Sequence, residues 1–167
     1  VCSSDLGSST FLNCTSLTAL SFPLLSRINT NAFGNCIRLT TVSFPLLSYV
    51  TTSVFYNCQQ LESVSFPNAA HIGSFAFTNC SNLSWASFAK VSYIYNNAFW
   101  GCSQLFSLYL LGSSVVTLQS LDAFENTPMN EAYQGRYGNV YVPSELYSSY
   151  LTATNWNNLQ SGIITPY

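Results

Sequence analysis

Charge is scarce in this sequence of 167 residues: four Lys and Arg and six Asp and Glu make up 6% of it, with a net charge of −2. A typical globular chain carries about 25% charged residues. Without a basic stretch, the chain cannot release phosphate counterions from a nucleic acid, so we expect no nucleic-acid partner. A disordered chain is excluded as well, because disorder requires low hydrophobicity and high charge, whereas 48% of these residues are hydrophobic.

Long apolar runs are also missing. No run approaches the roughly 20 residues needed to cross a bilayer, and no cationic segment precedes a hydrophobic one. We therefore expect no membrane span, and any export signal would lie upstream of this chain. A composition poor in charge but rich in Ser, Thr, Asn and aromatic residues is associated with extracellular proteins. The expected location is extracellular or at the cell surface.

Several residue types recur at a spacing of 22 residues. The repeated columns are Cys14, Cys36, Cys58, Cys80 and Cys102; Phe11, Phe33, Phe55, Phe77 and Phe99; Leu17, Leu39, Leu61, Leu83 and Leu105; Leu20, Val42, Val64, Ala86 and Leu108; and Phe22, Phe44, Phe66, Phe88 and Leu110. A fixed period indicates a solenoid, in which each unit buries its apolar face only by stacking on the next. The length fits one such domain.

Each unit contains the pattern Leu-x-x-Val-x-Phe, followed in three units by Pro23, Pro45 or Pro67. This alternation, bounded by proline, predicts a short strand. The preceding Ala-Phe-x-Asn-Cys predicts a turn or one helical turn on the opposite side. Stacked at the strand spacing of about 4.8 Å, the units predict an α/β repeat solenoid. It would be a right-handed, curved leucine-rich-repeat coil with a concave parallel β-sheet and short turns or helices on the convex side.

The unit resembles the short leucine-rich repeat of the BspA-like family, which occurs on surface proteins of gut and oral bacteria and of some parasitic protists. The resemblance covers about residues 7–125 and rests on five near-identical units. The last segment is similar to the cap that often closes these arrays, through Val140-Tyr-Val-Pro143, Leu146, Tyr150, Ala153, Asn155-Trp156 and Ile163. The resemblance implies adhesion or host interaction.

Three segments are expected along the chain. Residues 1–6 resemble a translated sequencing adaptor and are expected to be a non-native leader of a truncated metagenomic reading frame. Residues 7–125 form the repeats, and residues 126–167 form the C-terminal cap. In the cap, residues 140–142 are expected to add a strand and residues 143–145 to start a helix. The first coil has no equivalent cover, which predicts end-to-end self-association.

The cysteine column could be a metal ladder, a disulfide set or a buried row. Rungs about 4.8 Å apart hold the Cβ atoms beyond the roughly 3.8 Å that a disulfide needs. A linear row with one imidazole in the chain offers no tetrahedral zinc site. We therefore expect buried free thiols, with no metal and no cofactor. The residues before these cysteines, Asn13, Asn35, Asn57 and Asn79, are expected to hydrogen-bond the turn backbone or one another, with Gly101 ending the row.

No catalytic arrangement is evident. His71, the single histidine, occupies a column otherwise held by Arg27, Tyr49 and Tyr93, which we interpret as a surface column. The carboxylates are scattered, and no pair is spaced to share a proton or to split a glycosidic bond. Nucleophile and phosphate-loop motifs do not occur. We expect a protein that is not an enzyme and has no catalytic residues.

Outward-facing strand positions are the candidate binding surface. They are Ala19, Thr41, Ser63, Trp85 and Ser107, together with Ser21, Ser43, Ser65, Ser87 and Tyr109. The first three coils present small residues, and aromatic residues enter only in the last two. Exposed rings beside hydroxyls are typical of recognition surfaces. The candidate ligand-binding residues are therefore Trp85, Ser87, Phe106 and Tyr109, unless these rings, Phe106 above all, simply cover the junction with the cap.

Three functions fit this pattern. The first is a non-catalytic surface module that binds a host or neighbouring-cell protein or glycan. The second is a structural spacer that displays another domain, which the uniform Ser/Thr positions favour. The third is a carbohydrate-binding accessory module, which would bind sugar through Trp85 or Tyr109.

Overall fold

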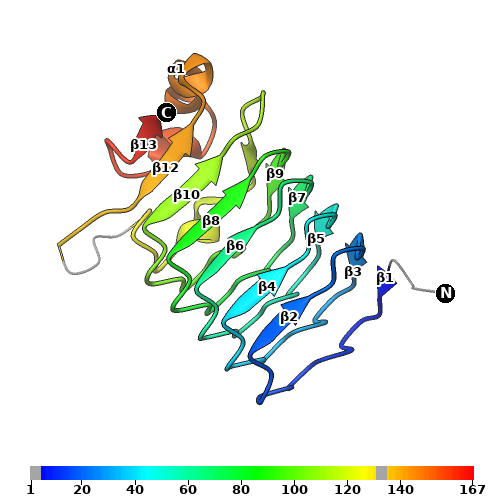
Figure 1. Cartoon of the computed structure of the whole chain (residues 1–167). Helices are drawn as coiled ribbons and strands as arrows, with labels where there is room; N and C mark the ends of the chain where they lie inside the picture. Colours follow the sequence, from blue (N-terminus) through cyan, green and yellow to red (C-terminus); the bar gives the residue numbers. More distant parts are fainter. Residues whose placement is uncertain (1–4, 131–134) are drawn as a thin grey trace.

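The computed structural model describes residues 5–130 and 135–167. The chain winds as a β-solenoid, and the 22-residue coil contributes strands to two parallel stacks, one on either side of a shared core (Figure 1). This arrangement confirms the predicted leucine-rich-repeat coil. Residues 1–4, which include Cys2, and residues 131–134, which include Glu131, lie outside the described part. Asp5 and Leu6, expected in a leader, form a strand that pairs with Arg27 and Ile28.

The longer strands lie on the Leu-x-x-Val-x-Phe segments of the repeats and continue into the C-terminal segment with two strands that lack this pattern, Asn139–Val142 and Ile164–Pro166. They are β2 (Ala19–Ser21), β4 (Thr41–Ser43), β6 (Ser63–Ser65), β8 (Trp85–Phe88), β10 (Ser107–Leu110), β12 (Asn139–Val142) and β13 (Ile164–Pro166). A two-stranded sheet holds β2 and β4, and a five-stranded sheet follows the order β6-β8-β10-β12-β13. The pairing is in register at the period of the sequence, so that Trp85 lies between Ser63 and Ser107.

A second, six-stranded sheet stands where turns or short helices were expected. Its two-residue strands are β1 (Asp5–Leu6), β3 (Arg27–Ile28), β5 (Tyr49–Val50), β7 (His71–Ile72), β9 (Tyr93–Ile94) and β11 (Thr117–Leu118). In four of them a β-branched residue, such as Ile28 or Val50, points into the core and is at most 1% exposed. Such short strands leave too few alternating residues for the sequence pattern to reveal them.

Phenylalanine ladders fill the space between the two stacks. Phe33, Phe55, Phe77 and Phe99 are fully buried, and consecutive rings lie 5.2 to 5.6 Å apart with nearly parallel planes. Parallel strands impose this geometry, because equivalent side chains of adjacent coils point the same way one strand spacing apart. The first coil is less protected, since its ring Phe11 is only half-buried.

The C-terminal segment ends both stacks. Strand β12 pairs with β10 and carries β13 on its far side. The remaining elements are short helices: η1 (Leu121–Phe124), η2 (Ser144–Leu146), α1 (Tyr147–Thr152) and η3 (Trp156–Asn158). Tyr150 and Trp156 are buried against the last coil, where Val116 N–H donates to the Tyr150 hydroxyl (3.0 Å) and Trp156 Nε1 donates to the Val116 carbonyl (2.6 Å).

Candidate functional site

The outward-facing side chains of the longer strands form a surface that we call the floor. On β2 and β4 the floor residues, among them Thr41 and Ser43, are exposed and small. Strand alternation causes this, because the intervening residues Leu20 and Val42 pack inward. These coils therefore offer hydroxyl and methyl groups but no ring and no charge.

Aromatic side chains enter the floor on β8 and β10. Trp85 is 39% exposed, and its ring meets that of Tyr109 edge-on, with centroids 6.4 Å apart and planes at 89°. Between them Trp85, Ser87, Ser107 and Tyr109 line an open hollow of about 400 Å³, which we call the floor hollow. Three of the four residues predicted from the sequence thus come together around one depression.

Phe106, the fourth predicted residue, does not line the floor hollow. It precedes β10 and is half-buried, and the Arg136 guanidinium lies over its ring at 5.3 Å from the centroid. A cation over a ring face is an attractive contact in its own right. Phe106 therefore contacts the segment that leads into β12. This contact fits the alternative in which Phe106 covers the junction between the repeats and the cap.

Tyr141 is a floor residue that the sequence analysis did not single out. It lies on β12 in register with Tyr109, and the two rings stack at 4.6 Å with planes 12° apart. The signal was present in the alternation of Val140-Tyr-Val142, which puts the tyrosine outward. With Tyr141, the aromatic part of the floor extends across three adjacent strands, Trp85 on β8, Tyr109 on β10 and Tyr141 on β12.

The cysteines of the column are free thiols, and all are buried inside the solenoid except Cys14, which is half-buried in the less protected first coil. Each sulfur of Cys36, Cys58, Cys80 and Cys102 donates a hydrogen bond of 3.1 to 3.2 Å to the carbonyl of the phenylalanine 25 residues earlier. Burial raises the pKa of the Cys36 thiol to about 11, and the nearby Cys14 thiol makes a smaller contribution in the same direction. Burial also raises the pKa of the Cys58, Cys80 and Cys102 thiols well above the ordinary value. These thiols are therefore protonated hydrogen-bond donors at neutral pH.

The asparagine column forms a hydrogen-bonded ladder, as one of the two expected arrangements. Asn35 Nδ2 donates to Asn13 Oδ1 at 2.8 Å, and Asn57 Nδ2 donates to Asn35 Oδ1 at 2.9 Å. These residues have φ near +60°, a region that asparagine tolerates better than most residues. At Gly101 (φ +73°) a Cβ would lie 2.6 Å from Asn79 Oδ1, so any side chain there would displace the Asn79 amide from its present position.

His71 lies in the second sheet, half-buried against Tyr49, with ring centroids 5.2 Å apart and planes 6° apart. Within residues 5–130 and 135–167, no three His, Cys, Asp or Glu side chains gather in a way that could hold a metal ion. No helix in the same residues is long and apolar enough to cross a membrane.

Taken together, two parallel strand stacks, internal phenylalanine ladders and an open floor define a leucine-rich-repeat solenoid with a surface suited to contacts. The family model for the BspA-type leucine-rich-repeat region matches residues 4–132 in six copies. The chain belongs to this family. No curated protein matches the chain.

Three solved structures share the fold at 18% identity. The pneumococcal vaccine antigen PcpA superposes with a TM-score of 0.71 over 98% of this chain and 39% of its own. A leucine-rich cell-surface protein of Faecalibacterium prausnitzii A2-165 has a TM-score of 0.53, and the match covers 84% of this chain and 52% of that protein. A leucine-rich-repeat protein of Bacteroides ovatus ATCC 8483 has a TM-score of 0.50, with 84% of this chain and 47% of that protein covered. The chain thus spans about two fifths to one half of these proteins.

Proposed function

We propose that this protein is a non-catalytic recognition module, displayed at the cell surface or secreted, that binds a partner protein through the aromatic part of the floor. The observation that carries the proposal is the clustering of Trp85, Tyr109 and Tyr141 on three adjacent strands of a floor that is otherwise small and polar. Binding energy at protein interfaces concentrates in such exposed aromatic anchors. Two of the similar structures, PcpA and the F. prausnitzii protein, are described as an antigen and a cell-surface protein, which supports the location.

The rigidity of the floor supports the same role. Trp85 is held by Tyr109, and Tyr109 by Tyr141, so the rings lose little conformational freedom when a partner arrives. Hydroxyls of Ser87 and Ser107 flank the rings and can hydrogen-bond a partner. Because the four residues lining the floor hollow carry no formal charge, we expect affinity that depends weakly on ionic strength.

Two other functions compete with this one. A structural spacer is favoured by the uniform floor of the first coils, Ala19 to Ser43, which offers nothing for a partner to anchor on. A carbohydrate-binding accessory module is favoured by the open shape of the floor hollow, where a sugar ring could stack on Trp85.

The decisive experiment is to probe arrays of host matrix proteins and glycans with the purified chain and with a Trp85→Ala/Tyr109→Ala double variant. A Tyr56→Ala/Phe75→Ala double variant is the matched control, because these rings are similarly exposed, at 38% and 40%, but lie outside the floor. We expect selective binding to a protein that the first variant loses and the control retains.

The other possible results of this experiment distinguish the two competing functions. Binding to glycans alone, lost in the Trp85→Ala/Tyr109→Ala variant, would make the protein a carbohydrate-binding module. No binding to either array would contradict recognition by this floor and favour the spacer. Binding that both double variants lose equally would indicate that the variants are misfolded or that the partner contacts another face.

A further inference from the structure

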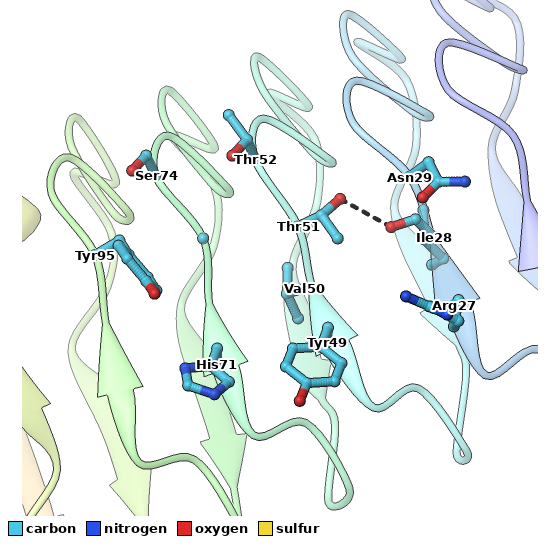
Figure 2. A pocket seen from close by; sticks show the side chains of 11 residues that line it. Arg27, Ile28, Asn29, Tyr49, Val50, Thr51, Thr52, His71, Ser74 and Tyr95 are labelled. Carbon is cyan, nitrogen blue, oxygen red and sulfur yellow. Dashed lines mark hydrogen bonds between the residues drawn. The ribbon is translucent and has the colours of Figure 1, made fainter.

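The second sheet carries a hollow that is separate from the floor. It has a volume of about 400 Å³ and is lined by residues of β3, β5 and β7 and of the turns that follow them, with Tyr95 closing one end. Figure 2 shows Tyr49 and His71 side by side, Arg27 reaching toward Tyr49 and Tyr95 beyond His71. We call it the second-sheet hollow. Its size falls at the small end of the range for ligand pockets, roughly 300 to 1,000 Å³.

Gly73 is one of the residues that line the second-sheet hollow. Gly73 directly follows the paired residue Ile72, and its N–H donates to the Val50 carbonyl of the preceding coil at 2.7 Å. A Cβ at Gly73 would lie 2.7 to 2.9 Å from the backbone of Thr51 and Thr52, so the two coils approach here as closely as backbone allows. A side chain at this position would require the coils to shift, so Gly73 contributes only backbone to the hollow.

Aromatic rings and one cation surround the second-sheet hollow. Tyr49 and His71 stack with planes 6° apart, and Tyr93 and Tyr95 continue the aromatic surface at 6.3 Å from His71. Arg27 is the one formally charged side chain among the lining residues. Asp5 lies in register beside it on β1, but a guanidinium has five N–H donors, so a carboxylate neighbour leaves donors for a ligand.

Polar groups complete the lining. The Thr51 hydroxyl donates to the Ile28 carbonyl at 2.8 Å, and the Ser74 hydroxyl donates to Asn96 Oδ1 at 2.7 Å, so both oxygens keep lone pairs that can accept. His71 Nδ1 is buried and has no hydrogen-bond partner among the described residues. The imidazole is thus held by ring stacking, and a small rotation toward a ligand hydroxyl would recover a hydrogen bond.

The strands around the hollow are paired on both sides: β3 with β1 and β5, β5 with β3 and β7, and β7 with β5 and β9. A peptide therefore cannot add here as an extra strand. A ligand that fits this lining has a small apolar face to contact the aromatic rings. It also has hydroxyl groups to bond Thr51 and Ser74, and a negative charge to pair with Arg27. A sugar ring with a carboxylate meets these three demands.

We propose that the second-sheet hollow binds a carboxylated sugar of a glycan, such as a hexuronic or sialic acid residue. Its apolar C–H groups contact the exposed parts of the stacked Tyr49 and His71 side chains, and its carboxylate accepts hydrogen bonds from Arg27 in the planar geometry that guanidinium favours. The site lies in the second sheet, whereas the floor hollow lies in the longer strands, so either can fail without the other.

The test titrates methyl glucuronide, the methyl glycoside of N-acetylneuraminic acid and neutral methyl glucoside, each up to roughly 20 mM, a range in which millimolar dissociation constants can be measured. Protein-observed NMR reports the site through the Gly73 amide and the His71 ring protons. We expect saturable shifts there with at least one carboxylated sugar and weaker binding of the glucoside.

Four variants locate the interaction. Arg27→Gln and Tyr49→Ser are each expected to weaken binding at least tenfold, whereas Arg38→Gln and Tyr56→Ser, which change exposed residues of the same types elsewhere, leave it unchanged. No shift at Gly73 and His71 with either carboxylated sugar would overturn the proposal. Equal affinity for the glucoside, or saturable binding of an acidic aromatic peptide in place of the sugars, would overturn it as well.

Discussion

At the residue scale, the contribution of a side chain depends on the column it occupies. Phe55 is fully buried between Phe33 and Phe77, with ring centroids 5.6 and 5.4 Å away, while Ser43 is exposed on β4. Removing a ring from the ladder leaves a cavity that the stacked coils cannot close, because their spacing is fixed by the strand hydrogen bonds.

We therefore predict that Phe55→Ala lowers the free energy of unfolding by about 3–5 kcal/mol. Ser43→Ala should change it by no more than about 0.5 kcal/mol, since it removes only an exposed hydroxyl. Urea unfolding of both variants measures the difference. Similar losses at the two positions would contradict the assignment of inner and outer faces.

The buried cysteines make the stability of the fold depend on pH. An unfolded thiol ionises near pH 8.5, whereas burial raises the pKa of the folded thiols above that value, to about 11 for Cys36 and further for Cys58. Above about pH 8.5 the unfolded chain binds fewer protons than the folded one, so stability falls as pH rises toward the folded pKa values.

The expected slope is up to about 1.4 kcal/mol per pH unit for each buried cysteine. Cys58→Ala removes one such thiol, so its stability should decline less steeply between pH 8.5 and 10, even though the variant starts from a lower value. Urea unfolding with a reductant present, at several pH values, gives both slopes. Parallel curves would show that Cys58 does not carry the effect.

At the scale of the element, the turns store strain at one position. A second column of positive φ runs through Asn31, Ser53, Phe75 and Asn97. Phe75, at φ +58° and 40% exposed, is the bulky member of a column that otherwise holds asparagine and serine. An L-residue with a large side chain pays about 1–2 kcal/mol for this conformation, and asparagine pays less.

Phe75→Asn is therefore predicted to raise the free energy of unfolding by about 0.5–1 kcal/mol. Tyr56→Asn is the control, because it removes a similarly exposed ring from a residue without positive φ. Thermal unfolding compares the two. A loss of stability in Phe75→Asn as large as that in the control would mean that the ring contributes packing that outweighs the strain.

The C-terminal segment supplies hydrogen-bond partners to the backbone of Val116, which is 1% exposed. The Val116 N–H donates to the Tyr150 hydroxyl, and the Val116 carbonyl accepts from Trp156 Nε1. Tyr150→Phe leaves the Val116 N–H buried without an acceptor, so we predict a loss of about 1–3 kcal/mol. Tyr147→Phe, in the same helix but half-buried, should stay within about 0.5 kcal/mol. Equal effects would argue against residues 126–167 acting as a cap for the last coil.

At the scale of the whole molecule, the two ends differ. Strands β1 and β2 each pair on one side only within the described residues, and Phe11, Leu17 and Phe22 beside them are half-buried. An unpaired strand edge next to apolar surface favours pairing with another chain. We predict concentration-dependent self-association of the 167-residue chain, measured by sedimentation velocity.

A lysine on the outer edge should weaken this association, because charge on an edge strand opposes strand pairing. Ala19→Lys, on β2, is therefore expected to shift the chain toward monomer. Thr41→Lys, on β4, is not, because β4 is covered by β2 on one side and by β6 on the other. A wild-type chain that stays monomeric at high concentration would contradict end-to-end association.

The sequence by itself determined the solenoid, its period and its inner and outer faces. The 22-residue columns assign Phe55, Cys58 and Val64 to the core and Ser43 and Trp85 to the surface without reference to any other segment. This is possible because each coil contacts only its neighbours, so a local pattern repeats as a global one.

Tertiary structure alone decided where side chains from different columns meet. The second sheet, the hollow at Gly73 and the stacking of Tyr141 on Tyr109 depend on which coils lie side by side and how closely their backbones approach. A 22-residue pattern fixes which type of residue recurs in each column, but it does not contain the distances between side chains of different columns. Those distances, and the candidate sites that they create, exist only once the coils are stacked.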